Sequence, residues 1–109
     1  MSWELVYQLV KKIPRGRVTT YGELARRLHI RGGARVVGYA MAGCPSGRGI
    51  PWHRVVGAGG RLIIREPYGS LQRKLLESEG VIIAGARVDM RRYALHRPKK
   101  KTAGRRRER

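Results

Sequence analysis

The chain has 109 residues, of which 41% are hydrophobic, so it is long enough for one small domain with a single core. It carries 25 lysines and arginines against 7 aspartates and glutamates, and this formal charge of +18 indicates a polyanionic partner: nucleic acid first, an anionic membrane second and an acidic protein third. The single cysteine excludes an intrachain disulfide, and no apolar run approaches the roughly 20 residues that span a bilayer.

The first predicted element is an amphipathic helix over residues 2–13, "SWELVYQLVKKI". Val6, Leu9 and Ile13 recur at helical spacing, and Ser2 is positioned to cap the start. The same N-terminal segment lacks a basic region ahead of an apolar stretch. We therefore expect no secretory signal and a cytoplasmic, nucleoid-associated protein without membrane contact.

The next segment, "TTYGELARRLHI", carries the pattern of a capping box, with Thr20 as N-cap and Glu23 three residues later. "RGG" interrupts the pattern, and a third short helix is predicted from Ala34 to about Met41. Two short helices joined by a glycine-containing turn are typical of a helix-turn-helix, in which the second helix recognises nucleic acid.

The rest of the chain is predicted to contain a loop, a hairpin, a helix and a strand region. "CPSGRGIP" reads as a loop, and "HRVVGAGGRLII" as two short strands around a glycine turn, a hairpin of the kind called a wing. "SLQRKLLESEG" predicts a helix capped by Ser70 and ended by Gly80, with Leu71, Leu75 and Leu76 as its buried stripe. "VIIAGARVDM" fits a closing strand region. The expected fold class is α/β, mainly helical: a winged helix-turn-helix-like domain with a small β-hairpin wing.

Residues 97–109, "RPKKKTAGRRRER", show no periodicity and predict a basic, disordered tail after a folded domain over residues 1–96. The tail holds eight basic residues and one acidic residue, so +7 of the formal +18 lies there and +11 lies on the domain. The folded part is thus itself expected to attract phosphate, and the tail to add affinity without sequence preference.

Four blocks in register, "TTYGELA", "GGARVVGYAM", "CPSGRGIPWHRVV" and "LLESEGV", resemble the DNA-binding domain of O6-alkylguanine-DNA alkyltransferases over about residues 3–90. Those repair enzymes carry Pro-Cys-His-Arg-Val, whose cysteine takes the alkyl group from a flipped guanine. Here residues 51–55 read Pro-Trp-His-Arg-Val, which is similar to the alkyltransferase-like proteins. That resemblance implies a protein that binds O6-alkylguanine without repairing it and hands the site to nucleotide excision repair.

Trp52 decides the expected chemistry. Alkyl transfer needs an activated thiolate, and an indole offers no such nucleophile at neutral pH. It offers instead a flat apolar wall for a flipped base, so the resemblance implies a lesion-binding pocket bordered by Pro51 and Trp52. The resemblance also identifies His53 and Glu79 as a vestigial catalytic relay, which we expect to be a structural hydrogen-bonded pair.

The resemblance implies two DNA-binding residues, Arg35 and Tyr21, and small side-chain size adds two more, Ala34 and Gly38. Arg35 is the finger that fills the gap left by the flipped nucleotide, a role suited to a planar, always charged guanidinium. Tyr21 is the tyrosine that pushes on the target phosphate. Ala34 would let the helix start approach the backbone, and Gly38 would let the helix lie close in the minor groove. Packing roles for Tyr21 and the small residues are the alternatives.

Two further residues have alternative readings. The resemblance places Arg65 against the extruded guanine, although Arg61 or Glu66 could shift the register of that loop. Cys44 stands where the transferases usually have a hinge asparagine. It is either an inert small core residue or a relocated nucleophile.

The sequence therefore predicts a monomeric, non-catalytic protein that needs no cofactor or metal. It would bind double-stranded DNA in the minor groove and flip O6-alkylguanine into a pocket lined by Trp52. The alternatives are a plain winged-helix DNA-binding protein, and an active alkyltransferase that uses another nucleophile.

Overall fold

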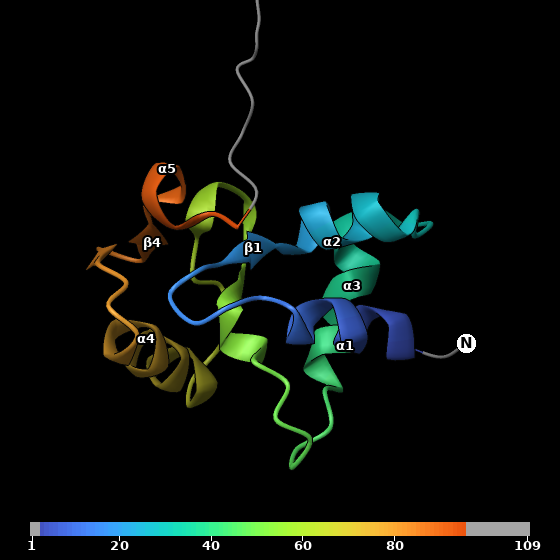
Figure 1. Cartoon of the computed structure of the whole chain (residues 1–109), viewed down its shortest axis with the longest axis horizontal. Coiled ribbons are helices and arrows are strands. Elements are labelled where there is room, and N and C mark those ends of the chain that lie inside the picture. The colour runs from blue at the N-terminus through green and yellow to red at the C-terminus, as the bar shows by residue number, and fades with distance from the viewer. Residues whose placement is uncertain (1–2, 96–109) are drawn as a thin grey trace, which may run out of the picture.

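The computed structural model describes residues 3–95, so the predicted cap Ser2 and the predicted tail 97–109 lie outside the described range. The boundary expected at residue 96 stays a prediction. The described elements, in chain order, are α1 (Glu4–Lys11), β1 (Thr19–Thr20), α2 (Tyr21–Leu28), α3 (Gly33–Ala42), the 3₁₀ turn η1 (Trp52–Arg54), β2 (Val55–Val56), the 3₁₀ turn η2 (Ala58–Gly60), α4 (Tyr68–Ser78), β3 (Ile83–Ala84), β4 (Arg87–Val88) and α5 (Met90–Tyr93) (Figure 1).

Two groups of buried side chains form the interior. The first lies among α1, α2 and α3 and includes Val10 and Val37; the second lies among the strands, α4 and α5 and includes Leu76 and Val88. Figure 1 shows the corresponding halves side by side, with α1–α3 on the right and α4 and α5 on the left. The mainly helical fold class predicted from the sequence is confirmed.

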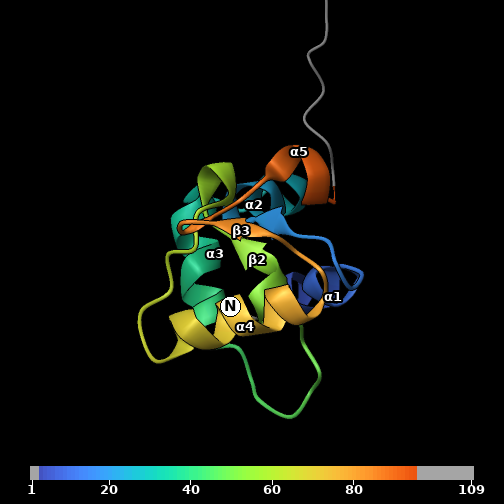
Figure 2. The same ribbon diagram turned by 90° about the vertical axis from the view of Figure 1, so that its left-hand side faces the viewer.

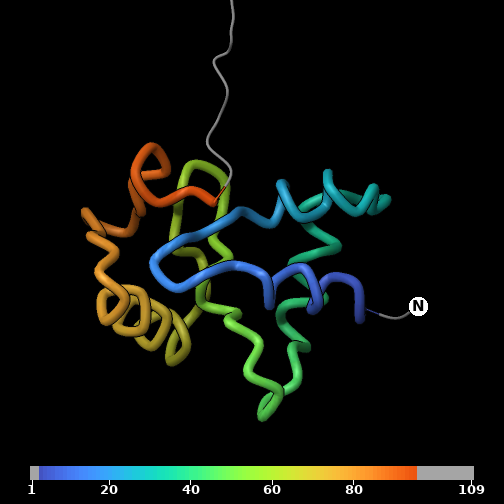
Figure 3. Tube along the Cα trace, viewed as in Figure 1, coloured from blue at the N-terminus to red at the C-terminus, as the bar shows by residue number. Residues whose placement is uncertain are grey.

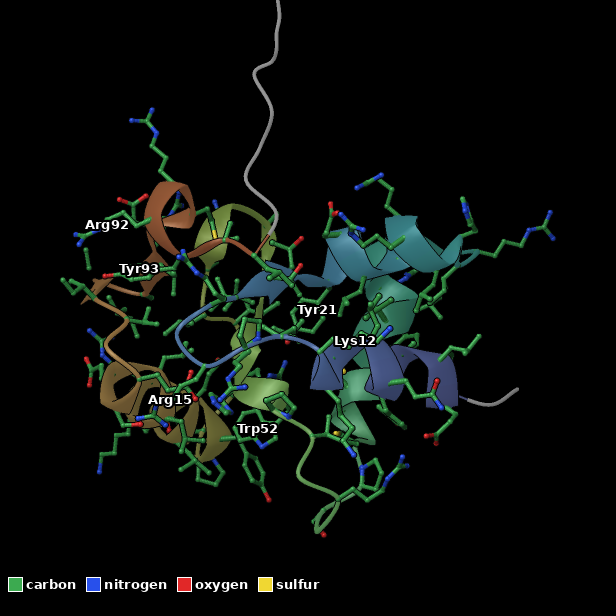
Figure 4. All side chains as sticks on the ribbon, viewed as in Figure 1. Lys12, Arg15, Tyr21, Trp52, Arg92 and Tyr93 are labelled. Atoms are coloured by element: carbon green, nitrogen blue, oxygen red, sulfur yellow. The ribbon has the colours of Figure 1, made fainter. Side chains whose placement is uncertain are left out.

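A short parallel strand pair joins the two halves. β1 pairs with β2 in the register Thr19 with Val55 and Thr20 with Val56. Because the strands run parallel, the turn that carries Trp52 precedes one end of the pair, whereas Tyr21 follows the other end. Figure 4 shows this separation: Tyr21 lies near the middle of the molecule and Trp52 beside α4.

The predicted helix-turn-helix is present as α2 and α3, which pack against each other. The Thr20 hydroxyl oxygen accepts the Glu23 amide at 3.0 Å, as the capping pattern predicts. The Glu23 carboxylate does not complete the box; it forms ion pairs with Arg26 at 2.6 Å and Arg27 at 2.8 Å on the exposed side of α2. The turn between α2 and α3 begins at His29, which has a left-handed backbone conformation with φ 54°.

A β-hairpin is also present, but not where the sequence predicted the wing. β3 and β4 pair antiparallel, whereas residues 53–64 form no hairpin. Val55–Val56 take β1 as their partner, and the Gly57 amide donates to the Arg61 carbonyl at 2.7 Å across a 3₁₀ turn. The predicted second strand runs instead beside the hairpin, where the Leu62 amide donates to the Ala86 carbonyl at 2.8 Å (Figure 2). The apolar run "RLII" therefore belongs to a partly exposed connection, in which Ile63 is 58% exposed.

The last long helix begins earlier than predicted. α4 starts at Tyr68, and Ser70 is not its cap; the Ser70 amide and hydroxyl both donate to the Glu66 carboxylate. The predicted buried stripe is also rotated. Leu71 is 42% exposed, whereas Gln72 is fully buried, so the inward face carries Gln72 and Leu76.

Within residues 3–95, no helix is long and apolar enough to cross a bilayer.

Candidate nucleic-acid interface

The connection from α3 to β2 presents Trp52. Residues 43–51 project from the body of the molecule (Figure 3), and Pro51 then starts the 3₁₀ turn η1. Trp52 is half-buried, and its ring meets two others edge-on: His53 at a centroid distance of 6.0 Å and Tyr68 at 6.3 Å. Two neighbouring rings thus contact the indole, while part of it remains open to solvent.

Glu79 is the centre of the hydrogen-bond network beneath this turn. Its carboxylate lies 2.7 Å from His53 Nε2, accepts from Arg54 Nη2 at 2.7 Å and accepts the Gly16 amide at 3.0 Å. The side chain of Glu79 is 4% exposed and that of Arg54 is 17% exposed. Burial alone raises the pKa of Glu79, but the hydrogen bonds from Arg54, Gly16 and His53 outweigh it and lower the pKa to about 2.

The predicted pair of His53 and Glu79 is therefore present, together with a partner that the sequence analysis left out. Arg54 adds a charged bond to Glu79 and donates to the Ile13 carbonyl at 2.8 Å, which ties the turn to the end of α1. The position directly after His53 could have revealed it, because the repair enzymes' motif includes this arginine. With a tryptophan at position 52, the network contains no thiol for the histidine to activate.

Gln72 is a second residue that the sequence analysis missed. Its side-chain amide donates to the carbonyl oxygens of His53 at 3.2 Å and Val55 at 3.0 Å, while its own Oε1 accepts from no described residue. Gln72 thereby holds α4 against the turn that carries Trp52. A polar residue one position from an apolar stripe gives no sequence signal for this role.

The outer face of α3 has the opposite character. Ala34, Arg35 and Tyr39 are exposed, and within residues 3–95 no ion pair or hydrogen bond holds the side chain of Arg35. A Cβ atom at Gly38 would meet nothing within 4 Å, so packing inside the protein does not require a glycine there. The starts of α2 and α3 lie close together, because a Cβ atom at Gly22 would lie 4.0 Å from the Ala34 Cβ.

Tyr21 and Arg65 lie in different settings. Tyr21, the first residue of α2, is 9% exposed and belongs to the core among α1–α3, and burial raises its pKa. Arg65 is exposed in the loop before α4, and its carbonyl accepts the Tyr68 amide at 3.1 Å. That bond puts Arg65 one turn from the ring that touches Trp52. The roles predicted for both residues on DNA stay predictions.

Cys44 is half-buried and packs against the core among α1–α3. Burial raises the pKa of its thiol, and the nearby Arg48 lowers it by less. A thiol with a raised pKa is mostly protonated at neutral pH and is a poor nucleophile.

A hollow of about 270 Å³ that is open to solvent is lined by Val18, Thr19, Thr20, Glu23, Gly59, Met90 and Ala94. None of these residues belongs to the group around Trp52. The hollow is therefore not the pocket that the resemblance implies for a flipped base.

Comparison with known proteins agrees with this geometry. The model of the 6-O-methylguanine DNA methyltransferase DNA-binding domain matches residues 2–81. The chain belongs to this family. A member named DNA base-flipping protein, from Escherichia coli, is 40% identical over 89 residues, which are 81% of this chain and 69% of that protein. Alkyltransferase-like protein 1 of Schizosaccharomyces pombe is 42% identical over 80 residues, covering 72% of this chain and 74% of its own.

The fold of this chain is also similar to that of a relative whose structure was solved in complex with DNA. A crystal structure of S. pombe Atl1 with damaged DNA that contains O6-carboxymethylguanine has a TM-score of 0.77 and 34% identity. The match covers 86% of this chain and 94% of that one. The resemblance to the alkyltransferase-like proteins, first drawn from four sequence blocks, is thereby confirmed.

Proposed function

We propose that this family member binds double-stranded DNA in the minor groove at O6-alkylguanine, flips the damaged base out of the duplex against Trp52 and Pro51, and leaves the alkyl group in place. The observation that carries the proposal is the turn at residues 51–54. Trp52 stands at the transferases' cysteine position, while His53 and Glu79 keep their bond of 2.7 Å. Two relatives support the same function by their names: one is called a DNA base-flipping protein and the other an alkyltransferase-like protein.

The two surfaces would divide the work. On α3, the exposed Arg35 would fill the space of the flipped nucleotide, and Gly38 with Ala34 would let the helix approach the groove. Tyr21 would press on the target phosphate, and Arg65 would contact the extruded base by a cation–π interaction. An alkyl substituent would gain about 0.8 kcal/mol for each CH₂ that it buries against Trp52.

Fluorescence titration tests the proposal with three matched duplexes that carry guanine, O6-methylguanine or O6-benzylguanine at one position. We expect tighter binding to both alkylated duplexes than to guanine, and no mass increase of the intact protein after prolonged incubation. Binding that ignores the alkyl group would contradict the proposal and favour a plain winged-helix DNA-binding protein.

A gain of one alkyl group by the protein would instead favour an active transferase. Cys44 is the only thiol in the sequence, and its raised pKa weighs against that alternative. Peptide mapping of any alkylated protein would show whether Cys44 carries the group. Trp52→Ala serves as the matched variant, since it should weaken binding to alkylated duplexes without changing the protein's mass after incubation.

The marked site would then pass to nucleotide excision repair. A protein that binds the lesion without removing it leaves the damage for another system, and a flipped, bound base distorts the duplex. Addition of the purified protein to a reconstituted excision reaction on an O6-methylguanine duplex should increase incision. An unchanged or lower incision rate would remove this step from the proposal.

A further inference from the structure

Tyr68 is a second aromatic residue at the turn that carries Trp52. The two rings lie at right angles with their centroids 6.3 Å apart. Tyr68 is 60% exposed, and its hydroxyl has no hydrogen-bond partner within residues 3–95. The pair therefore forms an aromatic corner, with one ring half-buried and the other open to whatever approaches Trp52.

The position of Tyr68 is fixed by the start of α4. Its amide donates to the Arg65 carbonyl at 3.1 Å, and the Glu66 carboxylate accepts the Ser70 amide at 3.1 Å and the Ser70 hydroxyl at 2.7 Å. A Cβ atom at position 69 would overlap the Ile64 carbonyl oxygen, so only glycine permits the loop to lie this close to the helix.

Gln72 fixes the other side of the corner. It follows Tyr68 by four residues, so both side chains project from the same face of α4. The Gln72 amide donates to the carbonyls on either side of Arg54, at His53 and Val55. One helix face thus holds the Tyr68 ring and the turn that presents Trp52 in a fixed relation.

We propose that Tyr68 is a specificity-determining residue that selects O6-alkylguanines with flat aromatic substituents. This inference rests on the proposed function, because it assumes that the flipped base lies against Trp52. Aromatic rings prefer edge-to-face and offset arrangements with centroids about 4.5–7 Å apart. A benzyl substituent on the base would reach into the corner and contact both rings, whereas a methyl group would contact Trp52 alone.

The test compares Tyr68→Ala with the unaltered protein on duplexes that carry guanine, O6-methylguanine or O6-benzylguanine. We expect Tyr68→Ala to weaken binding to the benzyl duplex by about 2- to 10-fold, the factor that corresponds to one aromatic contact, and to change the other two by less than about twofold. Tyr68→Phe should keep the preference, since the ring provides the contact. An equal loss on all three duplexes would overturn the proposal and assign Tyr68 to a general contact with DNA.

Tyr39→Ala is the matched control, because Tyr39 is 63% exposed and undergoes the same truncation on α3. It should change the three affinities by a common factor. If the unaltered protein does not distinguish guanine from O6-methylguanine, the proposed function itself fails. If it does, and Tyr68→Ala keeps the original ratio of benzyl to methyl affinity, only the inference about Tyr68 fails. Circular dichroism of each variant shows whether the fold is kept.

Discussion

The turn that carries Trp52 is held by hydrogen bonds on several sides, whereas the outer face of α3 has exposed side chains without such bonds to the rest of residues 3–95. At the Trp52 turn, Glu79 accepts hydrogen bonds from Arg54 and Gly16 and pairs with His53. Gln72 donates to the backbone carbonyl of His53 in the same turn. On α3, Arg35 is exposed and Gly38 borders open space. The carboxylate of Glu79 and the guanidinium of Arg54 in the first region are bonded within the protein, whereas the exposed Arg35 of the second has hydrogen-bonding capacity for a partner.

This difference explains why His53 and Glu79 can be retained in a protein that has no cysteine at position 52 for alkyl transfer. The network around Glu79 now stabilises the turn, so removing its members should lower the stability of the fold. The exposed residues of α3, such as Arg35 and Tyr39, contribute little to stability, so changing them should alter DNA binding more than the stability of the fold. Substitutions in the two regions separate these effects.

The largest effect is expected for Glu79→Gln. This change leaves the Arg54 guanidinium, 17% exposed, without its carboxylate, and breaking a buried ion pair costs about 3–5 kcal/mol. Urea unfolding, with circular dichroism as the probe, measures the loss in the free energy of unfolding. Glu23→Gln is the control, since its ion pairs with exposed arginines on α2 should contribute less than about 1 kcal/mol. Equal losses in both variants would show that the Glu79 network is not what holds the turn.

Acid should weaken the same network. The pKa of Glu79 is lowered from 4.5 to about 2 in the folded protein, so its carboxylate stabilises the fold fully above about pH 4.5. This contribution, on the order of 3 kcal/mol, is lost progressively as the pH falls from there through about 2. Thermal unfolding is followed at steps of about one pH unit from pH 6 down to pH 2. The melting temperature of the unaltered protein should fall more steeply with decreasing pH than that of Glu79→Gln. Parallel curves would contradict the assignment.

Gln72→Leu should have the next largest effect. It removes the donors to two buried backbone carbonyls and should cost about 2 kcal/mol. It should also reduce the preference for alkylated duplexes, because the Trp52 turn loses its clamp. Gln8→Leu on the exposed side of α1 is the matched control and should stay within about 0.5 kcal/mol. Unchanged stability in Gln72→Leu would mean that the clamp is dispensable.

The smallest stability change, and the opposite sign, is expected for Gly38→Ala. Alanine inside α3 should stabilise the helix by about 0.5–1 kcal/mol, since the new methyl group meets nothing within 4 Å. The same methyl group would obstruct the approach to the groove and weaken DNA binding on the order of 1 kcal/mol. Titration and urea unfolding of one variant give both numbers. A more stable protein with unchanged affinity would remove Gly38 from the interface.

The sequence predicts the helices of this protein better than its connections. Thr20 and the spacing of the apolar residues place α2 correctly, because capping and periodicity are local properties. The hairpin was misplaced because the choice between β1 and residues 62–64 as partner for Val55–Val56 depends on contacts distant in sequence. Likewise, Leu71 and Gln72 exchange their expected burial because α4 begins at Tyr68 and is rotated toward the backbone groups of the turn.

The residues of the candidate site likewise divide into those that the sequence predicted and those that it did not. The resemblance supplied His53 and Glu79, and their contact is confirmed. Gln72 and Tyr68 could not be predicted, because their positions follow from the packing of α4 against the turn that carries Trp52. That turn lies far from α4 in the sequence: 19 residues separate His53 from Gln72. His53 and Glu79 are 26 residues apart and were found only because a family motif names them, and no such motif names Gln72 or Tyr68.

The bond between Gly16 and Glu79 joins residues 63 positions apart, whereas α2 and α3 are neighbours in the chain. Loop-closure entropy delays contacts between distant residues, and local helix pairs form faster. During folding, the helix-turn-helix should therefore assemble first, and the Trp52 turn should reach its final shape only when α4 docks. The helix pair proposed to contact DNA should thus form before the turn proposed to hold the damaged base, and on unfolding the turn should be lost first.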